Sequence, residues 1–386
     1  MSSLKRYVRA MPARDIHESH RSATPLELLF DLISVIAIAA AAAGLHHAIS
    51  AGHLGEGLLK FGAAFFGVWW AWMNYTWFAS AYDNDDVPFR LLTMVIMAGS
   101  LTMAAGISAF FESADLTMVV VGYVIMRAAM ILLWLRAARY DQARRTTALW
   151  YAGGIAIAQV YWVALLFVKP GAAFGFSLLF AVGAGLELAV PVLAEKRGET
   201  PWHRHHIIER YGLLTIIVLG ETLLSASMAL RSAFGGSFNV ALVHIALSAL
   251  VIVFSMWWVY FSRENHLETN DLRRALTWGY GHVFIFASGA AVGAGFAVLV
   301  DVVTENASIG LLAGDYAVAV PVALFLLGLW FVRDRFLFVS AGRVLLPVFP
   351  VAVLAAPLAL GLEGVALVTM VAAISRSLIS GKRAGK

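Results

Sequence analysis

Cysteine is absent from this chain of 386 residues, and charged residues are scarce. Without cysteine the chain has no disulfide, no thiolate nucleophile and no Cys-ligated metal. Charged residues make up 13% of the chain and hydrophobic residues 61%, and the mean hydropathy is +0.79. A soluble globular protein carries about 25% charged and about 45–50% apolar residues. The composition therefore excludes an ordinary soluble domain.

Motifs for several kinds of chemistry are also absent. The chain has no GxxxxGK[ST] phosphate loop, no GxSxG nucleophile elbow, no HExxH zinc motif and no GxGxxG after a predicted strand. The net charge is +4, but the basic residues fall in short segments between apolar blocks, which is a membrane pattern rather than a nucleic-acid-binding one. We therefore predict no enzymatic activity, no cofactor and no nucleic-acid partner.

Long apolar blocks dominate what is present. "LLFDLISVIAIAAAAAGL" (28–45) and "LVHIALSALVIVFSMWWVYF" (242–261) are long enough to cross a hydrocarbon core about 30 Å thick. The polar, basic first 24 residues have no apolar core before a cleavage site, so we expect no cleavable signal peptide. The pattern predicts an all-α polytopic membrane helical bundle with about twelve transmembrane helices. The predicted spans are 26–47, 60–80, 88–111, 117–138, 147–168, 173–194, 207–229, 240–262, 274–300, 314–333, 343–361 and 363–380.

The loops between the predicted spans alternate in charge. One set is rich in Lys and Arg, from Lys5 and Arg6 at the start of the chain to Lys386 at its end, whereas the other set holds acids such as Glu112 and Asp301. Positively charged loops remain in the cytoplasm, so both termini are predicted to be cytoplasmic. An even number of spans agrees with this prediction, because it places both termini on the same side of the membrane.

Tryptophan-rich segments indicate an internal repeat. "VWWAWMNYTWF" (68–78) resembles "MWWVYF" (256–261), with an offset of 188 residues from Trp69 to Trp257. A second pair, "LLWLRAARY" and "GLWFVRDRF", has a similar offset of 196 residues. Such offsets are typical of a six-plus-six duplication with parallel halves, although anchoring of Trp at the membrane interface also explains them. The predicted parts are a cytoplasmic segment 1–24, a first six-helix half 25–200, a second half 201–381 and a cytoplasmic tail 382–386.

Three long blocks carry a family resemblance: "PLELLFDLISVIAIA" (25–39), "WWAWMNYTWFASAYDNDDVPFRLLTM" (69–94) and "ERYGLLTIIVLGETLL" (209–224). They resemble the bacterial low-temperature-requirement A family, and the similarity extends from about Pro25 to the last predicted span. The resemblance implies a multi-spanning protein of the bacterial inner membrane that is linked, by the family's name, to growth in the cold. It implies no substrate and no catalytic residues.

Ionisable side chains inside predicted spans are the main functional candidates, because a charge there is costly and marks a pathway or a pairing partner. Glu221 is the clearest case. Eleven residues, most of them apolar, separate it from Glu209, which places it roughly 18 Å further along a helix axis. The six such positions are Asp31, Arg127, Glu187, Glu221, His244 and His282.

Two interpretations of these charges stay open. In the structural one, Arg127 pairs with Glu187 or Glu221 and fixes helix packing, since a buried ion pair is often close to neutral for stability. That pairing leaves one carboxylate, and also Asp31, without a cationic partner at a comparable depth. In the functional one, such a carboxyl binds a proton and carries it. The candidate residues of an ion or proton pathway are Asp31, Glu221, Glu187, Arg127, Glu27 and Glu209.

The acidic loop before Pro88 is an accessory candidate. Asp85 or Asp86 can cap the next helix, and Pro88 suits its first turn. Together with Asp83 they also make an acidic vestibule that attracts cations. His244 and His282 are further accessory candidates.

The "HRHHIIER" segment (203–210) places His205, His206 and Glu209 on one face of a helix. Two histidines and a carboxylate are a candidate zinc set. The neighbouring arginines, however, favour simple anchoring at the cytoplasmic surface. We therefore predict no metal site.

A carrier coupled to protons or another cation is the predicted function, with two halves that rock about a midplane site. The solute or ion is not identified by the sequence, and the lipid bilayer is the expected environment. A cation channel is a second hypothesis, because "FDLISVIAIA" (30–39) loosely resembles the first helix of a class of lysosomal and bacterial potassium channels. The chain has no repeated Ser/Thr stripe for a pore, which counts against a channel. An intramembrane lipid-modifying enzyme and a scaffold without flux, either of them linked to growth in the cold, are the remaining hypotheses.

Overall fold

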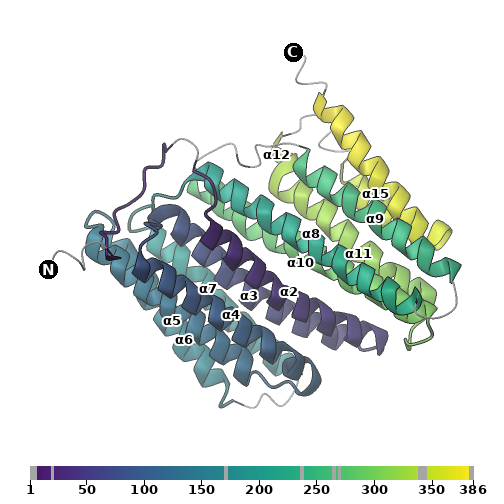
Figure 1. Cartoon of the computed structure of the whole chain (residues 1–386), viewed down its shortest axis with the longest axis horizontal. Helices are drawn as coiled ribbons and strands as arrows, with labels where there is room; N and C mark the ends of the chain where they lie inside the picture. Colours follow the sequence, from purple (N-terminus) through teal and green to yellow (C-terminus); the bar gives the residue numbers. More distant parts are fainter. Residues whose placement is uncertain are drawn as a thin grey trace. The chain divides into compact units, whose positions relative to one another are not determined.

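The computed structural model describes residues 7–18, 21–168, 173–234, 239–262, 267, 271–337 and 346–381. All regular secondary structure in these residues is helical (Figure 1). The predicted all-α polytopic bundle is therefore confirmed. The predicted tail 382–386 and part of the predicted segment 1–24 lie outside the described residues.

The chain divides into two compact units. Unit 1 comprises Met1–Ala41 and Ala63–Arg210, and unit 2 comprises Ala42–Gly62 and Tyr211–Lys386. The end of the first long helix and the start of the second thus belong to unit 2, although their remaining turns belong to unit 1. The predicted repeat of two six-helix halves stays a prediction.

Unit 1 is built mainly from six helices. They are α2 (Pro25–Ser50), α3 (Leu54–Tyr82), α4 (Val87–Ser113), α5 (Thr117–Tyr140), α6 (Arg145–Leu165) and α7 (Ala173–Glu195). Helices α4 and α5 cross closely because glycine faces glycine. A Cβ atom on Gly122 would collide with the backbone nitrogen of Met103, and one on Gly99 would lie 2.7 Å from the carbonyl of Gly122.

Local sequence signals explain where two of these helices begin. Thr24 precedes α2, and its backbone N–H donates to Glu27 while its hydroxyl accepts from the Glu27 N–H, which is a capping box. Asp86 caps α4 by accepting from the Phe89 N–H at 3.0 Å, with Pro88 in the first turn. The predicted capping role of the acidic loop is therefore confirmed for Asp86.

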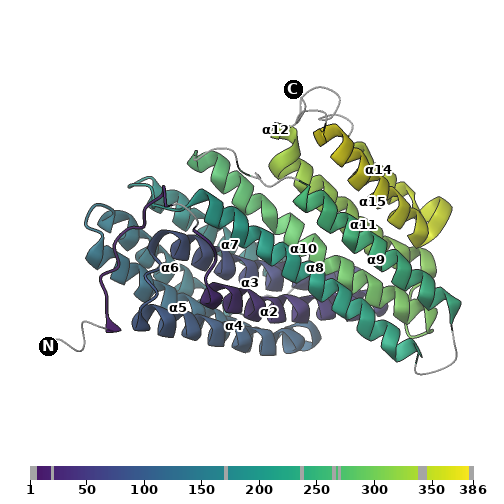
Figure 2. The same ribbon diagram turned by 45° about the horizontal axis from the view of Figure 1, so that its top comes forward.

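Unit 2 contains the remaining helices, except that the first turns of α8 (Arg204–Phe234), up to Arg210, belong to unit 1. The helices are α8, α9 (Val240–Phe261), α10 (Leu272–Val303), α11 (Leu311–Leu329), the π-helical turn η1 (Trp330–Asp334), α12 (Arg335–Leu337), α14 (Val348–Ala355) and α15 (Pro357–Gly381). Figure 2 shows α14 folded back beside α15, with α9 and α11 as their neighbours. The reversal occurs at Gly361, whose φ of +58° is a left-handed conformation that favours glycine.

Nine helices in the described ranges are long and apolar enough to cross a membrane. Helices α3 and α8, with 29 and 31 residues, also have the length to do so. The predicted span 343–361 differs. Among its described residues, α14 has only 8 residues, or roughly 12 Å, and the turn at Gly361 follows the first turn of α15. The chain is a multi-pass membrane protein whose eleventh predicted span is a short helix.

Candidate functional site

Glu187 lies at the centre of a buried polar site in unit 1. Its Oε2 accepts from Nη2 of Arg127 at 2.6 Å and from the indole N–H of Trp70 at 3.0 Å. Its Oε1 accepts from the Tyr123 hydroxyl at 2.9 Å, from the Gln159 amide at 3.0 Å and from the Trp162 indole at 3.3 Å. Helices α3, α5 and α6 thus each supply donors to one carboxylate on α7. The prediction that Arg127 pairs with Glu187 or Glu221 is confirmed for Glu187.

Only one nitrogen atom of the Arg127 guanidinium, Nη2, donates to Glu187. Its side chain is completely buried, and its Nε and Nη1 have no hydrogen-bond partner in the part of the chain that the structure describes. The Oε1 of Gln159 is likewise buried without a partner there. Unpaired buried polar atoms are costly, so these two donors and one acceptor remain able to bind water or another polar molecule.

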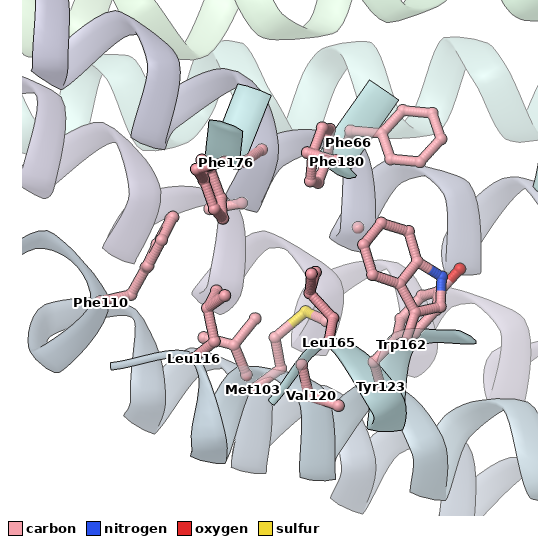
Figure 3. A pocket seen from close by; sticks show the side chains of 14 residues that line it. Phe66, Met103, Phe110, Leu116, Val120, Tyr123, Trp162, Leu165, Phe176 and Phe180 are labelled. Atoms are coloured by element: carbon pink, nitrogen blue, oxygen red, sulfur yellow. The ribbon is translucent and has the colours of Figure 1, made fainter. Parts of the chain in front are cut away.

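An apolar cavity of about 50 Å³ adjoins this polar centre. Figure 3 shows Tyr123 and Trp162, two of the donors to Glu187, at one end of the cavity, and Phe110 at the other. Phe66, Met103, Phe176 and the other labelled side chains are apolar. The centre therefore joins a charged pair to a small apolar space.

Asp31 takes part in a second buried site in unit 1, and the expectation that it has no cationic partner is wrong. Arg210, on the first turns of α8, donates through Nη2 to Oδ1 of Asp31 at 2.5 Å and through Nε to Oδ2 at 3.2 Å. The indole N–H of Trp72 donates to Oδ1 at 2.6 Å. All three side chains are fully buried or nearly so. Arg210 is thus a buried counter-ion rather than a surface anchor.

Glu27 shares the same arginine. Its Oε1 lies 2.9 Å from Nη1 of Arg210 and 3.1 Å from Nε2 of His206. Its Oε2 accepts from the N–H and hydroxyl of Thr24. The spacing of four residues puts Glu27 and Asp31 on one face of α2, as the sequence predicted, and this face meets the start of α8.

Asp83 completes the site from the end of α3. Its Oδ2 lies 3.7 Å from Nη2 of Arg21, which also lies 3.9 Å from Oε1 of Glu27. Burial, followed by the negative charge of Glu27, raises the pKa of Asp83 from its ordinary 3.8 to about 6. Asp83 therefore keeps its proton to a higher pH than an ordinary aspartate does.

The charges of this second site do not cancel. We call its members the α2 cluster: Arg21, Glu27, Asp31, Asp83, His206 and Arg210. Three carboxylates face two guanidinium groups and one imidazole, so the cluster is neutral only when it binds one further proton. Arg14 and Glu18 at its edge pair with each other at 2.6 Å and leave this balance unchanged.

The other acids of the loop before α4 serve structure. Arg136 pairs with Asp86 and also donates to the carbonyl of Arg9 at 2.9 Å. Arg90 pairs with Asp85 at 2.6 Å on the surface. Asp83, Asp85 and Asp86 therefore divide between a buried cluster, an exposed pair and a helix cap.

The candidate zinc set is not assembled. His206 points to Glu27, Glu209 accepts from the backbone N–H of Ala23 at 3.2 Å, and His205 is exposed. The described residues contain no group of three or more His, Asp or Glu side chains with metal-binding geometry.

Glu221 lies on α8 in unit 2, half-buried. No described residue forms a hydrogen bond or an ion pair with its side chain. Arg127, its other predicted partner, is engaged by Glu187. Glu221 is thus a carboxyl at depth in a long apolar helix without a counter-charge in the described ranges.

The two accessory histidines differ in environment. His282 is fully buried, with Nδ1 2.7 Å from the carbonyl oxygen of Trp278 and Nε2 3.2 Å from the Tyr260 hydroxyl. His244 is exposed and lies 2.8 Å from Glu363. His282 therefore serves packing, whereas His244 forms a surface pair.

A third buried ionic group, in unit 2, escaped the sequence analysis. Asp334 accepts from Nε of Arg333 at 2.9 Å and from Nη2 of Arg376 at 2.7 Å. Both arginines also donate to the carbonyl of Val259 near the end of α9. The signal was available for Arg376, which lies inside the predicted span 363–380. Arg210 also had a signal, because it follows Glu209 and begins an apolar stretch.

The comparisons with known proteins agree with this architecture. The family model described as bacterial low temperature requirement A protein (LtrA) matches residues 22–378. An uncharacterized protein of Rhizobium meliloti (strain 1021) is 27% identical over 241 residues, which is 61% of this chain and 57% of that protein. The chain thus matches little more than half the length of this relative. No solved structure matches. The family match covers nearly the whole chain, and the chain belongs to the bacterial low temperature requirement A family.

Proposed function

We propose that this protein is a proton- or cation-coupled secondary transporter of the bacterial inner membrane, with both termini in the cytoplasm. The observation that carries the proposal is the unbalanced charge of the α2 cluster. Three buried carboxylates against two buried arginines require one exchangeable proton. A transporter that uses a proton gradient needs such a site.

Asp31 and Glu221 are the proposed acids of the pathway. Asp31 is held by Arg210, so its affinity for a proton depends on whether that pair is closed. Glu221 has no partner among the described residues and is free to take up an ion. Glu27 and Glu209 lie on the side where α8 begins and form the cytoplasmic end of the proposed path.

Glu187 and Arg127 have a different proposed role. Their tight pair neutralises both charges, and two nitrogen atoms of Arg127 remain without a hydrogen-bond partner among the described residues. These N–H groups would donate to a polar acceptor of the transported solute. In the proposed cycle the acids of the pathway are exposed alternately to each side of the membrane.

The test is ion flux in proteoliposomes that contain a pH-sensitive dye, under imposed proton, Na⁺ or K⁺ gradients. Asp31→Asn removes one carboxylate from the α2 cluster, so the cluster is balanced without a proton, and we expect flux to fall at least about tenfold. Glu221→Gln is expected to lower flux similarly. Glu112→Gln, which changes an exposed acid at the end of α4, is the matched control and is expected to match wild type.

Thermal unfolding of each variant separates loss of function from loss of fold. If wild type moves no ions under any gradient, or if Asp31→Asn and Glu221→Gln both transport at the wild-type rate, the proposal is wrong. Saturation of the rate with the driving ion distinguishes a carrier from a channel.

A further inference from the structure

A groove of about 390 Å³ runs between α6 and α7 in unit 1. Gly153 leaves the groove open on the α6 side, because it has no side chain and a Cβ atom there would meet nothing within 4 Å. The neighbouring Gly154 is different, because it packs against Val190 on α7. The groove is lined by Leu149, Trp150, Gly153, Gly154, Ile157, Ala158, Leu186, Ala189, Val190 and Leu193. Its lining is apolar apart from the indole of Trp150.

Exposed aliphatic side chains continue the groove onto the surface. Ile157 on α6 is 68% exposed, and Leu193 on α7 is 45% exposed. Both helices are long and apolar enough to cross a membrane. Apolar surface at this depth suits hydrocarbon chains rather than water.

Positive charge gathers at one end of the groove. The guanidinium of Arg197 lies 4.7 Å from the centre of the Trp150 ring, which forms part of the lining. Arg145 begins α6 and Lys196 follows the last residue of α7, so both lie at this same end. All three cations are exposed, and none has a carboxylate within 4 Å in the described residues. By the predicted topology, this end faces the cytoplasm.

We propose that this groove binds an anionic phospholipid. An acyl chain lies along the glycine-lined groove, and the headgroup phosphate lies against Arg197, Lys196 and Arg145. Cationic pockets between transmembrane helices recognise anionic headgroups in this way. The indole of Trp150 holds the guanidinium of Arg197 in place through its ring face. The proposal rests on this groove and does not depend on transport.

The test is native mass spectrometry of the detergent-solubilised protein, titrated with phosphatidylglycerol or with phosphatidylcholine of the same acyl chains. A cationic side chain near the headgroup contributes about 1 kcal/mol, which is roughly fivefold in affinity. Wild type is therefore expected to bind phosphatidylglycerol at least about tenfold more tightly. Arg197→Ala is expected to weaken phosphatidylglycerol binding about fivefold and phosphatidylcholine binding much less, because the choline ammonium opposes the attraction of its phosphate to the cations.

Further variants distinguish binding of the acyl chain in the groove from binding of the headgroup by the cations. Gly153→Leu places a side chain in the groove, with a Cβ atom that meets nothing within 4 Å, and we expect it to remove the tightest-bound lipid of either kind. Gly185→Leu is the matched control, because Gly185 is an exposed glycine on α7 with equally open space and lies outside the lining. Arg273→Ala is the control for charge.

Equal binding of the two lipids by wild type would overturn the proposal. The proposal would also be overturned if Gly185→Leu weakened lipid binding as much as Gly153→Leu, or Arg273→Ala as much as Arg197→Ala. The same spectra report the oligomeric state. If Gly153→Leu changes the ratio of monomer to dimer and leaves lipid binding intact, the groove is a contact between copies of the chain and the proposal fails.

Discussion

Removing one partner of the Arg127–Glu187 pair is expected to destabilise unit 1 strongly. Arg127→Met keeps the apolar stem but leaves the Glu187 carboxylate with four neutral donors and no cation. Breaking a buried pair in this way costs about 3–5 kcal/mol, because it leaves an uncompensated charge. The four remaining hydrogen bonds offset part of that cost and place the expected loss near the lower end, about 3 kcal/mol.

The reverse variant, Glu187→Gln, gives an equally definite expectation. Its single carbonyl can still accept from Tyr123 and Gln159, but its amide nitrogen then faces the N–H groups of Trp70 and Arg127. Arg127 becomes a buried cation without a counter-ion, so the loss is again expected to be about 3–5 kcal/mol. The double variant Arg127→Met/Glu187→Gln carries neither charge. It is expected to lose at least about 2 kcal/mol less than the sum of the single losses.

The assay is reversible unfolding of the purified protein in mixed micelles, followed by circular dichroism, for wild type, both single variants and the double variant. Arg139→Met, which changes an exposed arginine on α5, is the control and is expected to stay within about 0.5 kcal/mol of wild type. The reasoning is refuted if Arg127→Met costs less than about 1 kcal/mol, or if the losses of the single variants simply add.

Three further predictions use the same unfolding assay. Because the pKa of Asp83 is raised to about 6 from 3.8, the folded state binds its proton more tightly, so this carboxyl makes wild type less stable as pH rises from about 4 to about 6. Asp83→Asn should remove that slope, a gain of about 3 kcal/mol over wild type above pH 6, and an unchanged slope would contradict the assignment. Asp86→Ala removes a helix cap and should cost at least about 1 kcal/mol, whereas Asp85→Asn, which removes the charge of an exposed pair and keeps a side chain suited to its φ of +49°, should cost less than about 0.5 kcal/mol; equal costs would count against the cap. Gly122→Ala forces a methyl group onto the backbone of α4 and should cost about 1–3 kcal/mol, whereas Gly153→Ala meets open space and should stabilise its helix slightly. Equal effects of these two alanines would show that the helix crossing is not tight.

The helices were predictable because each apolar run of about 20 residues has few structural options in a membrane. The cap of α4 was also predictable, since an acid two residues before Pro88 is a local signal. The capping box of Thr24 and Glu27 has a local signal as well, a threonine followed three residues later by glutamate.

The partners of buried charges were harder to predict. Arg127 had two candidate acids on other helices, and only the fold selects Glu187 over Glu221. Asp31 and Arg210 are 179 residues apart, and Arg210 stands beside histidines and another arginine that indicate a membrane surface. Pairing over such a separation is set by helix packing, which the spacing of residues along one helix does not determine.

The central claim is that this protein moves protons or another cation through buried and half-buried carboxyls. The most direct measurement is the transient current that a jump in pH, Na⁺ or K⁺ evokes in proteoliposomes adsorbed on a solid-supported membrane. We predict a current in wild type that grows with the size of the step in the coupling ion and is lost in Glu221→Gln, while both proteins unfold at similar temperatures. The absence of any current in wild type, or an undiminished current in Glu221→Gln, would contradict the claim.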